Sequence, residues 1–230
     1  MKFVQIIDYK TADFDGMNSV MERWVEQTRG KRTTGHAVTG KDRTDSRHYV
    51  DIVEFNSYEE AMENSHLPET DTMFQEMVAL CDGMPSFTDL DVVREEQLNA
   101  AVARRFFHEV AVGGNMDAIG EMFAADYTDH DVASEAAAET GPDVIRRDVG
   151  MWRDAFDFTF ELDRQVCEGD DVVLLWTWNG KHKADFMGIP ASGDECTMTG
   201  TTVFRFEGGK IREGWWHFDL LGLMKQLGAA

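Results

Sequence analysis

The chain has 230 residues, a formal net charge of −21 and 43% hydrophobic residues. This length suits two globular domains of about 100 to 130 residues each. An acidic surface repels nucleic acid and anionic membranes, so neither is expected as a partner. No apolar run is long enough to span a membrane, and Asp8 follows too soon for an N-terminal signal peptide, which predicts a cytoplasmic protein.

The pattern of metal-ligating residue types predicts no metal site. Cys81, Cys167 and Cys196 lie far apart and form no CxxC spacing, so neither a zinc site nor a disulfide framework is indicated. His182 and Asp185 would point to opposite faces of a strand, so one metal ion could not easily bind both.

The first part of the chain predicts a β-α-β-β-α-β order, which is a ferredoxin-like unit. Hydrophobic periodicity and turn residues indicate strands at 2–10, 33–40, 48–55 and 87–93 and helical regions at 11–30, 57–65 and 70–81. The second helical region is interrupted at Pro68, which cannot continue a helix.

The pattern changes near residue 95, where helices come first and strands follow. We expect helices at 95–112, 116–127 and 141–156, then strands at 158–168, 170–186, 196–208 and 210–222. This order predicts a separate α+β domain with a long antiparallel sheet. The predicted domains are therefore residues 1–97 and 98–230.

Four segments of the second domain carry a family resemblance: FAADYTDHD, GDDVVLLWTWNGKHKADFMGIPASG, FRFEGGKIREGWW and DLLGLMKQLG. Over about residues 99–228 the chain resembles the SnoaL-like polyketide cyclase or ester cyclase group of the nuclear transport factor 2-like superfamily. The resemblance implies a cone-shaped α+β barrel around an apolar cavity. It also implies acid-base reactions, such as cyclisation, isomerisation, dehydration or hydrolysis, without metal or organic cofactor.

The first domain resembles the dimeric α/β-barrel group that includes small antibiotic-biosynthesis monooxygenases. This resemblance rests on the order of its elements and on the segment HYVDIVEFNSYEEAMENS. It implies a homodimer whose two sheets close into one barrel.

Strand alternation places the even residues from Val172 to His182 on one apolar, inward face. The resemblance implies that His182 neighbours the catalytic carboxylate, which makes it a candidate to polarise a carbonyl or transfer a proton. The alternative is a histidine that a backbone carbonyl satisfies. Candidate substrate-binding residues are the aromatic Trp176, Trp178, Phe186, Trp215 and Trp216, because aromatic rings stack flat ligands, although they also suit plain core packing.

The resemblance implies an aspartate as general base on the strand CTMTGTTVFRF, where this chain has Thr202 and no acid between Cys196 and Phe206. A threonine cannot deprotonate a carbon acid near neutral pH. Either another carboxylate replaces it or the reaction differs.

The residues that could replace the missing general base lie in two segments. Alternation in 210–222 predicts that Ile211, Glu213, Trp215, His217 and Asp219 share one face. Asp219 is the first choice and His130 the second, with Glu213, His217, Asp129 and Asp131 as further cavity candidates. Alternatively, Asp219 caps a C-terminal helix.

The leading hypothesis is a cofactor-independent enzyme that acts on a hydrophobic, carbonyl-bearing, polyketide-like molecule through His182 and Asp219. A second hypothesis is a non-catalytic binding or assembly protein. A third places a cofactor-free monooxygenase in the first domain. A homodimer is expected in each case.

Overall fold

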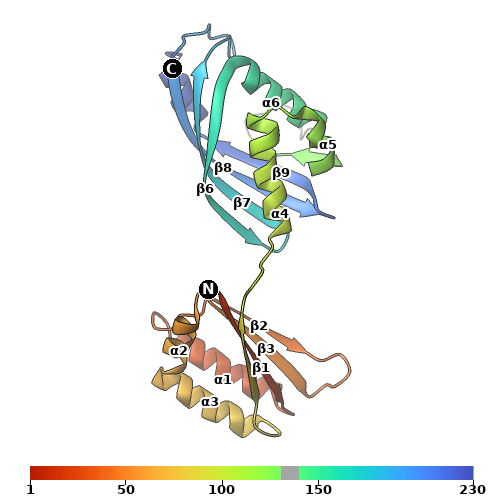
Figure 1. Cartoon of the computed structure of the whole chain (residues 1–230), viewed down its shortest axis with the longest axis vertical. Helices are drawn as coiled ribbons and strands as arrows, with labels where there is room; N and C mark the ends of the chain where they lie inside the picture. Colours follow the sequence, from red (N-terminus) through yellow and green to blue (C-terminus); the bar gives the residue numbers. More distant parts are fainter. Residues whose placement is uncertain (131–139, 230) are drawn as a thin grey trace. The chain divides into compact units, whose positions relative to one another are not determined.

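The computed structural model describes residues 1–130 and 140–229. These residues form two compact units, Met1–Glu95 and Glu96–Ala230, each with its own sheet (Figure 1). Asp131 lies outside the described residues. Each unit mixes helices and strands, so the fold is α+β in both.

The first unit has a four-stranded sheet in the order β2-β3-β1-β4, and all neighbouring strands are antiparallel. Its elements are β1 (Phe3–Lys10), α1 (Phe14–Gln27), β2 (His36–Lys41), β3 (His48–Phe55), α2 (Tyr58–Ser65), α3 (Pro68–Leu80) and β4 (Ser86–Asp91). The predicted element order is confirmed, and Pro68 begins α3 as the break in the helical region predicted.

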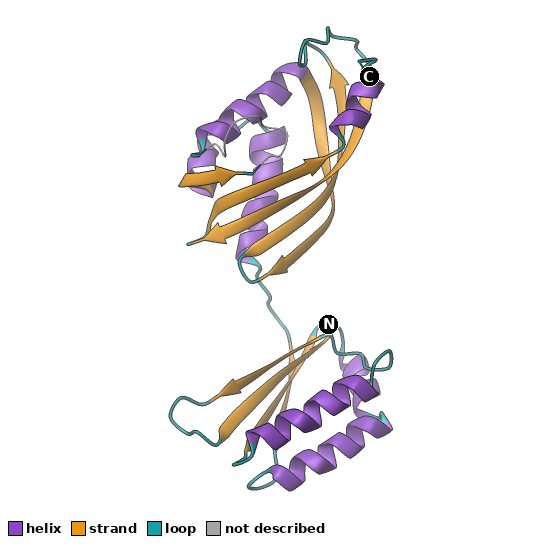
Figure 2. Cartoon of the chain, turned by 180° about the vertical axis from the view of Figure 1, so that it is seen from behind, coloured by secondary structure: helices purple, strands orange, loops and turns teal. Residues whose placement is uncertain are grey.

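The helices of this unit lie together on one face of its sheet (Figure 2). Tyr9 and Tyr49 of the sheet pack there against Met17 of α1 and Met77 of α3. The alternating residues point to the other face, which no helix of the unit covers. On that open face Val38, Ile52 and Leu90 are 48%, 40% and 43% exposed.

The second unit has a five-stranded sheet in the order β5-β9-β8-β7-β6. Its helical elements are α4 (Leu98–Arg105), the π-helical η1 (Phe106–Val112), the short 3-10 turn η2 (Met116–Ala118), α5 (Ile119–Met122), α6 (Asp143–Ala155) and α7 (Leu220–Gln226). Its strands are β5 (Phe123–Asp129), β6 (Phe156–Glu168), β7 (Asp171–His182), β8 (Glu195–Glu207) and β9 (Lys210–Phe218). The long strands curve past α4 and α6, which lie on the inner side of the sheet (Figure 2).

The prediction of a helix over 116–127 is wrong in its second half. The helix ends at Met122, and from Phe123 the backbone pairs in parallel with β9 instead. Tyr127 and Asp129 then point inward from the same face of β5. Pairing with a neighbouring strand overrides the local helical pattern here, and it adds a parallel edge to a sheet that was predicted to be antiparallel.

The predicted inward face of β7 is confirmed, because every even residue from Val172 to His182 is buried. The predicted face of β9 is wrong. One extra residue, Arg212, forms a β-bulge between the pairings of β9 with β8, so Ile211 shares the inner face with Gly214 and Trp216. Beyond the bulge, the opposite face carries Glu213, Trp215 and His217.

Candidate functional site

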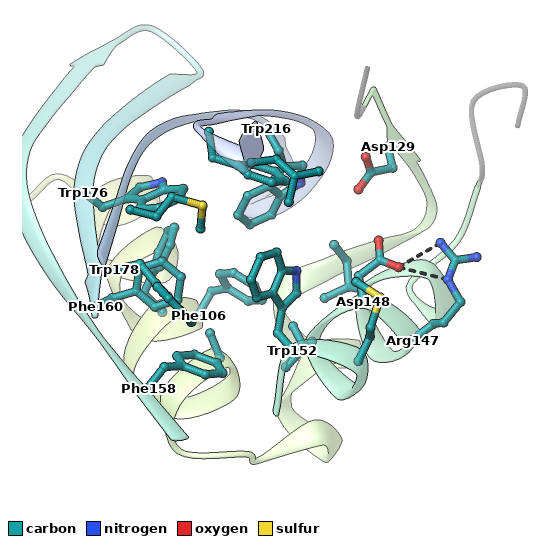
Figure 3. A pocket seen from close by; sticks show the side chains of 18 of the residues that line it. Phe106, Asp129, Arg147, Asp148, Trp152, Phe158, Phe160, Trp176, Trp178 and Trp216 are labelled. Atoms are coloured by element: carbon teal, nitrogen blue, oxygen red, sulfur yellow. Dashed lines mark hydrogen bonds and ion pairs between the residues drawn. The ribbon is translucent and has the colours of Figure 1, made fainter. Parts of the chain in front are cut away.

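A cavity of about 600 Å³ lies between the inner face of the second sheet and the helices η1 and α6. Its walls are mainly aromatic, and Figure 3 shows rings from both layers around it: Phe106, Trp152, Phe158, Phe160, Trp176 and Trp178. This size and lining suit a small hydrophobic ligand.

On the sheet side of the cavity, a hydrogen bond and close packing fix the indole of Trp176. Trp176 donates its Nε1–H to Oγ1 of Thr202 at 2.9 Å. Its ring lies over Gly200, where a Cβ atom would come within 2.3 Å of the indole. A glycine at this position therefore lets the indole lie flat on β8. Thr202 is fully buried beneath it and does not line the cavity.

The polar end of the cavity is built from β5 and α6. Asp129 of β5 is 6% exposed and accepts a hydrogen bond from the Tyr127 hydroxyl, with 2.8 Å between Oη and Oδ2. Asp148 of α6 is half-buried and forms an ion pair with Arg147, with 2.9 Å between Nε and Oδ1. Figure 3 shows the two carboxylates pointing toward one another.

Tyr127 is protonated at this site. Burial raises the pKa of its hydroxyl above the usual range, and the charges of Asp129 and Asp148 raise it further. A hydroxyl that keeps its proton remains a donor to the Asp129 carboxylate.

His130 also lines the cavity, and a separate set of contacts holds it. Its Nε2 lies 2.8 Å from Oε2 of Glu213, and its ring stacks on Trp215 with 4.5 Å between the ring centres. Arg205 also lies over the Trp215 indole, with 5.5 Å between its Cζ and the ring centre. The imidazole of His130 is therefore fixed at the cavity by β9.

His182 is fully buried at the end of β7 but does not line the cavity. Its ring stacks on Phe156 at 5.0 Å, and its Nδ1 accepts the Ser192 backbone N–H at 3.2 Å. Because Nδ1 accepts, the proton of the neutral ring lies on Nε2. Among the described residues, that buried Nε2 has no hydrogen-bond partner.

The predicted pairing of His182 with Asp219 is not what the structure shows. Asp219 is the N-cap of α7, and its carboxylate accepts the Gly222 N–H at 2.8 Å, which confirms the alternative that it caps a helix. His217 is exposed, and with Asp219 it borders a separate hollow beside Thr199. The bulge at Arg212 explains these positions, because it turns His217 away from the cavity.

The structure thus divides the predicted site residues. Those that line the main cavity are Asp129, His130, Trp176, Trp178, Phe186, Trp215 and Trp216, and those that do not are His182, Thr202, Glu213, His217 and Asp219.

The sequence reasoning missed Tyr127, Arg147, Asp148 and Trp152. A signal for one of them was present: Ile145, Asp148, Val149 and Trp152 follow helical spacing, so a carboxylate lies on the apolar face of α6.

No helix among the described residues has the length and hydropathy needed to cross a bilayer. Within the same residues, no three His, Cys, Asp or Glu side chains converge as metal ligands would.

Comparisons with known proteins match the second unit. Among solved structures, a proposed polyketide cyclase from Acidithiobacillus ferrooxidans is 30% identical, and the match covers 61% of this chain and 100% of that chain with a TM-score of 0.54. TsrD from Streptomyces laurentii is 27% identical over 60% of this chain and 100% of that chain, with a TM-score of 0.53.

IdmH, a proposed polyketide cyclase from Streptomyces antibioticus, shares the fold at 24% identity and a TM-score of 0.51, over 58% of this chain and 99% of that chain. None of the curated proteins matches this chain. The model of the SnoaL-like polyketide cyclase family matches residues 101–227, which is more than half of the sequence. Through its second unit, the chain belongs to the SnoaL-like polyketide cyclase family.

Proposed function

We propose that the second unit is a cofactor-independent acid-base enzyme that acts on a hydrophobic, carbonyl-bearing small molecule. The observation that supports this most is the pair of carboxylates, Asp129 and Asp148, at one end of an otherwise aromatic cavity. The pair replaces the His182 and Asp219 of the sequence hypothesis. Two of the similar proteins are described as proposed polyketide cyclases, which agrees with a hydrophobic, carbonyl-bearing substrate.

The reaction begins with proton abstraction next to the carbonyl group. Asp129 is the more buried carboxylate and acts as general base: the C–H bond breaks, an O–H bond forms on Asp129, and the electron pair moves to the carbonyl oxygen. The ion pair with Asp148 holds the Arg147 guanidinium at the cavity. His130 and Arg147 also line the cavity, and the Arg147 guanidinium is the donor that stabilises the resulting enolate oxygen. The proton then returns from Asp129 to the product.

Exchange of carbon-bound hydrogen tests this proposal without knowledge of the natural substrate. The protein is incubated in D2O with 2-tetralone, a hydrophobic ketone, and deuterium uptake at the α-carbon is followed by NMR. We expect faster uptake than in buffer, and a loss of about 100-fold or more in Asp129→Asn and in Asp148→Asn.

The matched control is Asp126→Asn on the same strand, because Asp126 forms an ion pair with Arg212 and does not line the cavity. This variant should exchange as the unaltered protein does. Unchanged rates in both Asp129→Asn and Asp148→Asn would rule the proposal out. Binding of the ketone without any catalysed exchange would instead favour the non-catalytic binding protein.

We also propose that the first unit is a ferredoxin-like domain that forms a homodimer through its open sheet face. The sheet order and the exposed Val38, Ile52 and Leu90 on that face support this proposal. A sheet is stable when both apolar faces are covered, and the helices of the unit cover one of them.

A further inference from the structure

We propose that Tyr127 is a positioning residue that holds the Asp129 carboxylate ionised and aimed into the cavity, and that Gly214 provides the space Tyr127 needs. This inference rests on the proposed role of Asp129 as base, and it assigns the residues that support that base.

Tyr127 and Asp129 are two residues apart on β5, so their side chains point to the same side of the strand. Tyr127 is fully buried and donates its O–H to Oδ2 of Asp129 at 2.8 Å. The shared face and the short contact therefore aim the tyrosine proton at the Asp129 carboxylate.

Gly214 of β9 is the residue directly opposite Asp129 in the parallel pairing of the two strands. A Cβ atom at Gly214 would lie 2.3 Å from the Tyr127 hydroxyl oxygen, well inside van der Waals contact. Its φ is not in the left-handed region, so the backbone does not require glycine here. Space for the tyrosine hydroxyl is the reason that the structure offers for glycine at this position.

Simple core packing is the competing explanation for Tyr127, because its ring also meets Phe123 edge-on at 5.0 Å. The hydroxyl separates the two explanations. Tyr127→Phe keeps the ring and its packing but removes the donor to Asp129. A hydrogen bond to the charged form of a carboxylate lowers its proton affinity, so its loss should make Asp129 easier to protonate.

The test is a carbon-13 NMR titration of protein labelled at the aspartate carboxyl carbon, with Asp129→Asn identifying the Asp129 signal. In Tyr127→Phe the midpoint of that signal should rise by about one pH unit. Gly214→Ala should raise it in the same direction, because the added methyl group displaces the hydroxyl. Gly120→Ala is the matched control, since no heavy atom lies within 4 Å of a Cβ atom there, and it should leave the midpoint unchanged.

Among the residues that the structure describes, the charged groups around Asp129 are Asp148 and Arg147 on α6, and His130 with Glu213 at the β5–β9 edge. They are the same in all of these variants, so a shift reports the hydroxyl alone. An unshifted midpoint in folded Tyr127→Phe overturns the positioning role, even if Gly214→Ala fails to fold. The titration needs no turnover, so a failure of the exchange assay would remove the proposed reaction and leave this result standing.

Discussion

At the scale of single residues, the position of His182 indicates a role in core packing rather than in catalysis. It is enclosed by the aromatic core, stacks on Phe156 and does not reach the cavity. We predict that His182→Ala lowers the free energy of unfolding by about 2 to 4 kcal/mol, because it leaves a hole in a packed core. The rate at which this variant catalyses deuterium uptake by 2-tetralone, measured below the unfolding transition, should stay within a few fold of the rate of the unaltered protein. Normal stability in urea together with lost exchange would return His182 to the catalytic site.

The candidate site could be predicted from the sequence only in part, and single residues show why. Asp129 and His130 were identified because they lie in the family segment FAADYTDHD, and Trp176 and Trp178 because strand alternation is regular in β7. Tyr127 was missed because it was assigned to a helix over 116–127, whereas the helix ends at Met122 and Tyr127 lies on a strand. Its partnership with Asp129 depends on pairing with β9, which is distant in sequence.

At the scale of elements, the glycine of β8 determines how the sheet side of the cavity is formed. A Cβ atom at Gly200 would come within 2.3 Å of the Trp176 ring and 2.8 Å of the His217 carbonyl oxygen. We predict that Gly200→Ala moves the indole into the cavity, breaks its hydrogen bond to Thr202 and costs about 1 to 3 kcal/mol of stability. Urea unfolding and the affinity for 2-tetralone measure the two effects, and both should weaken.

Gly120→Ala on α5 serves as the control, since open space surrounds that position. A Gly200→Ala protein that binds the ketone with unchanged affinity would show that this wall is not part of the ligand site.

The order of the elements could be read from the sequence, because the periodicities of the long segments are strong. The bulge at Arg212 and the parallel edge strand could not, because both arise from contacts between strands rather than from local pattern.

At the scale of the whole molecule, the two units differ in how fully their sheets are covered. The second unit has a closed core around its cavity, whereas the first has one sheet face covered and one open. The open face presents Val38, Ile52 and Leu90, and the paired strands bring Val38 opposite Ile52 and Leu90 opposite Val4. A second copy of the same face is complementary in character to this apolar surface, which is the basis of the proposed homodimer.

Sedimentation velocity tests the homodimer directly. We predict that the unaltered chain sediments as a dimer and that Ile52→Lys shifts it to the monomer, because a lysine charge at the centre of an apolar interface loses its hydration without gaining a partner. Val25→Lys is the matched control: Val25 lies on α1 and is 44% exposed, close to the 40% of Ile52, but it points away from the open face. That variant should remain dimeric. A dimer that survives Ile52→Lys would place the contact elsewhere on the chain, and a monomeric unaltered protein would mean that the open sheet face tolerates water.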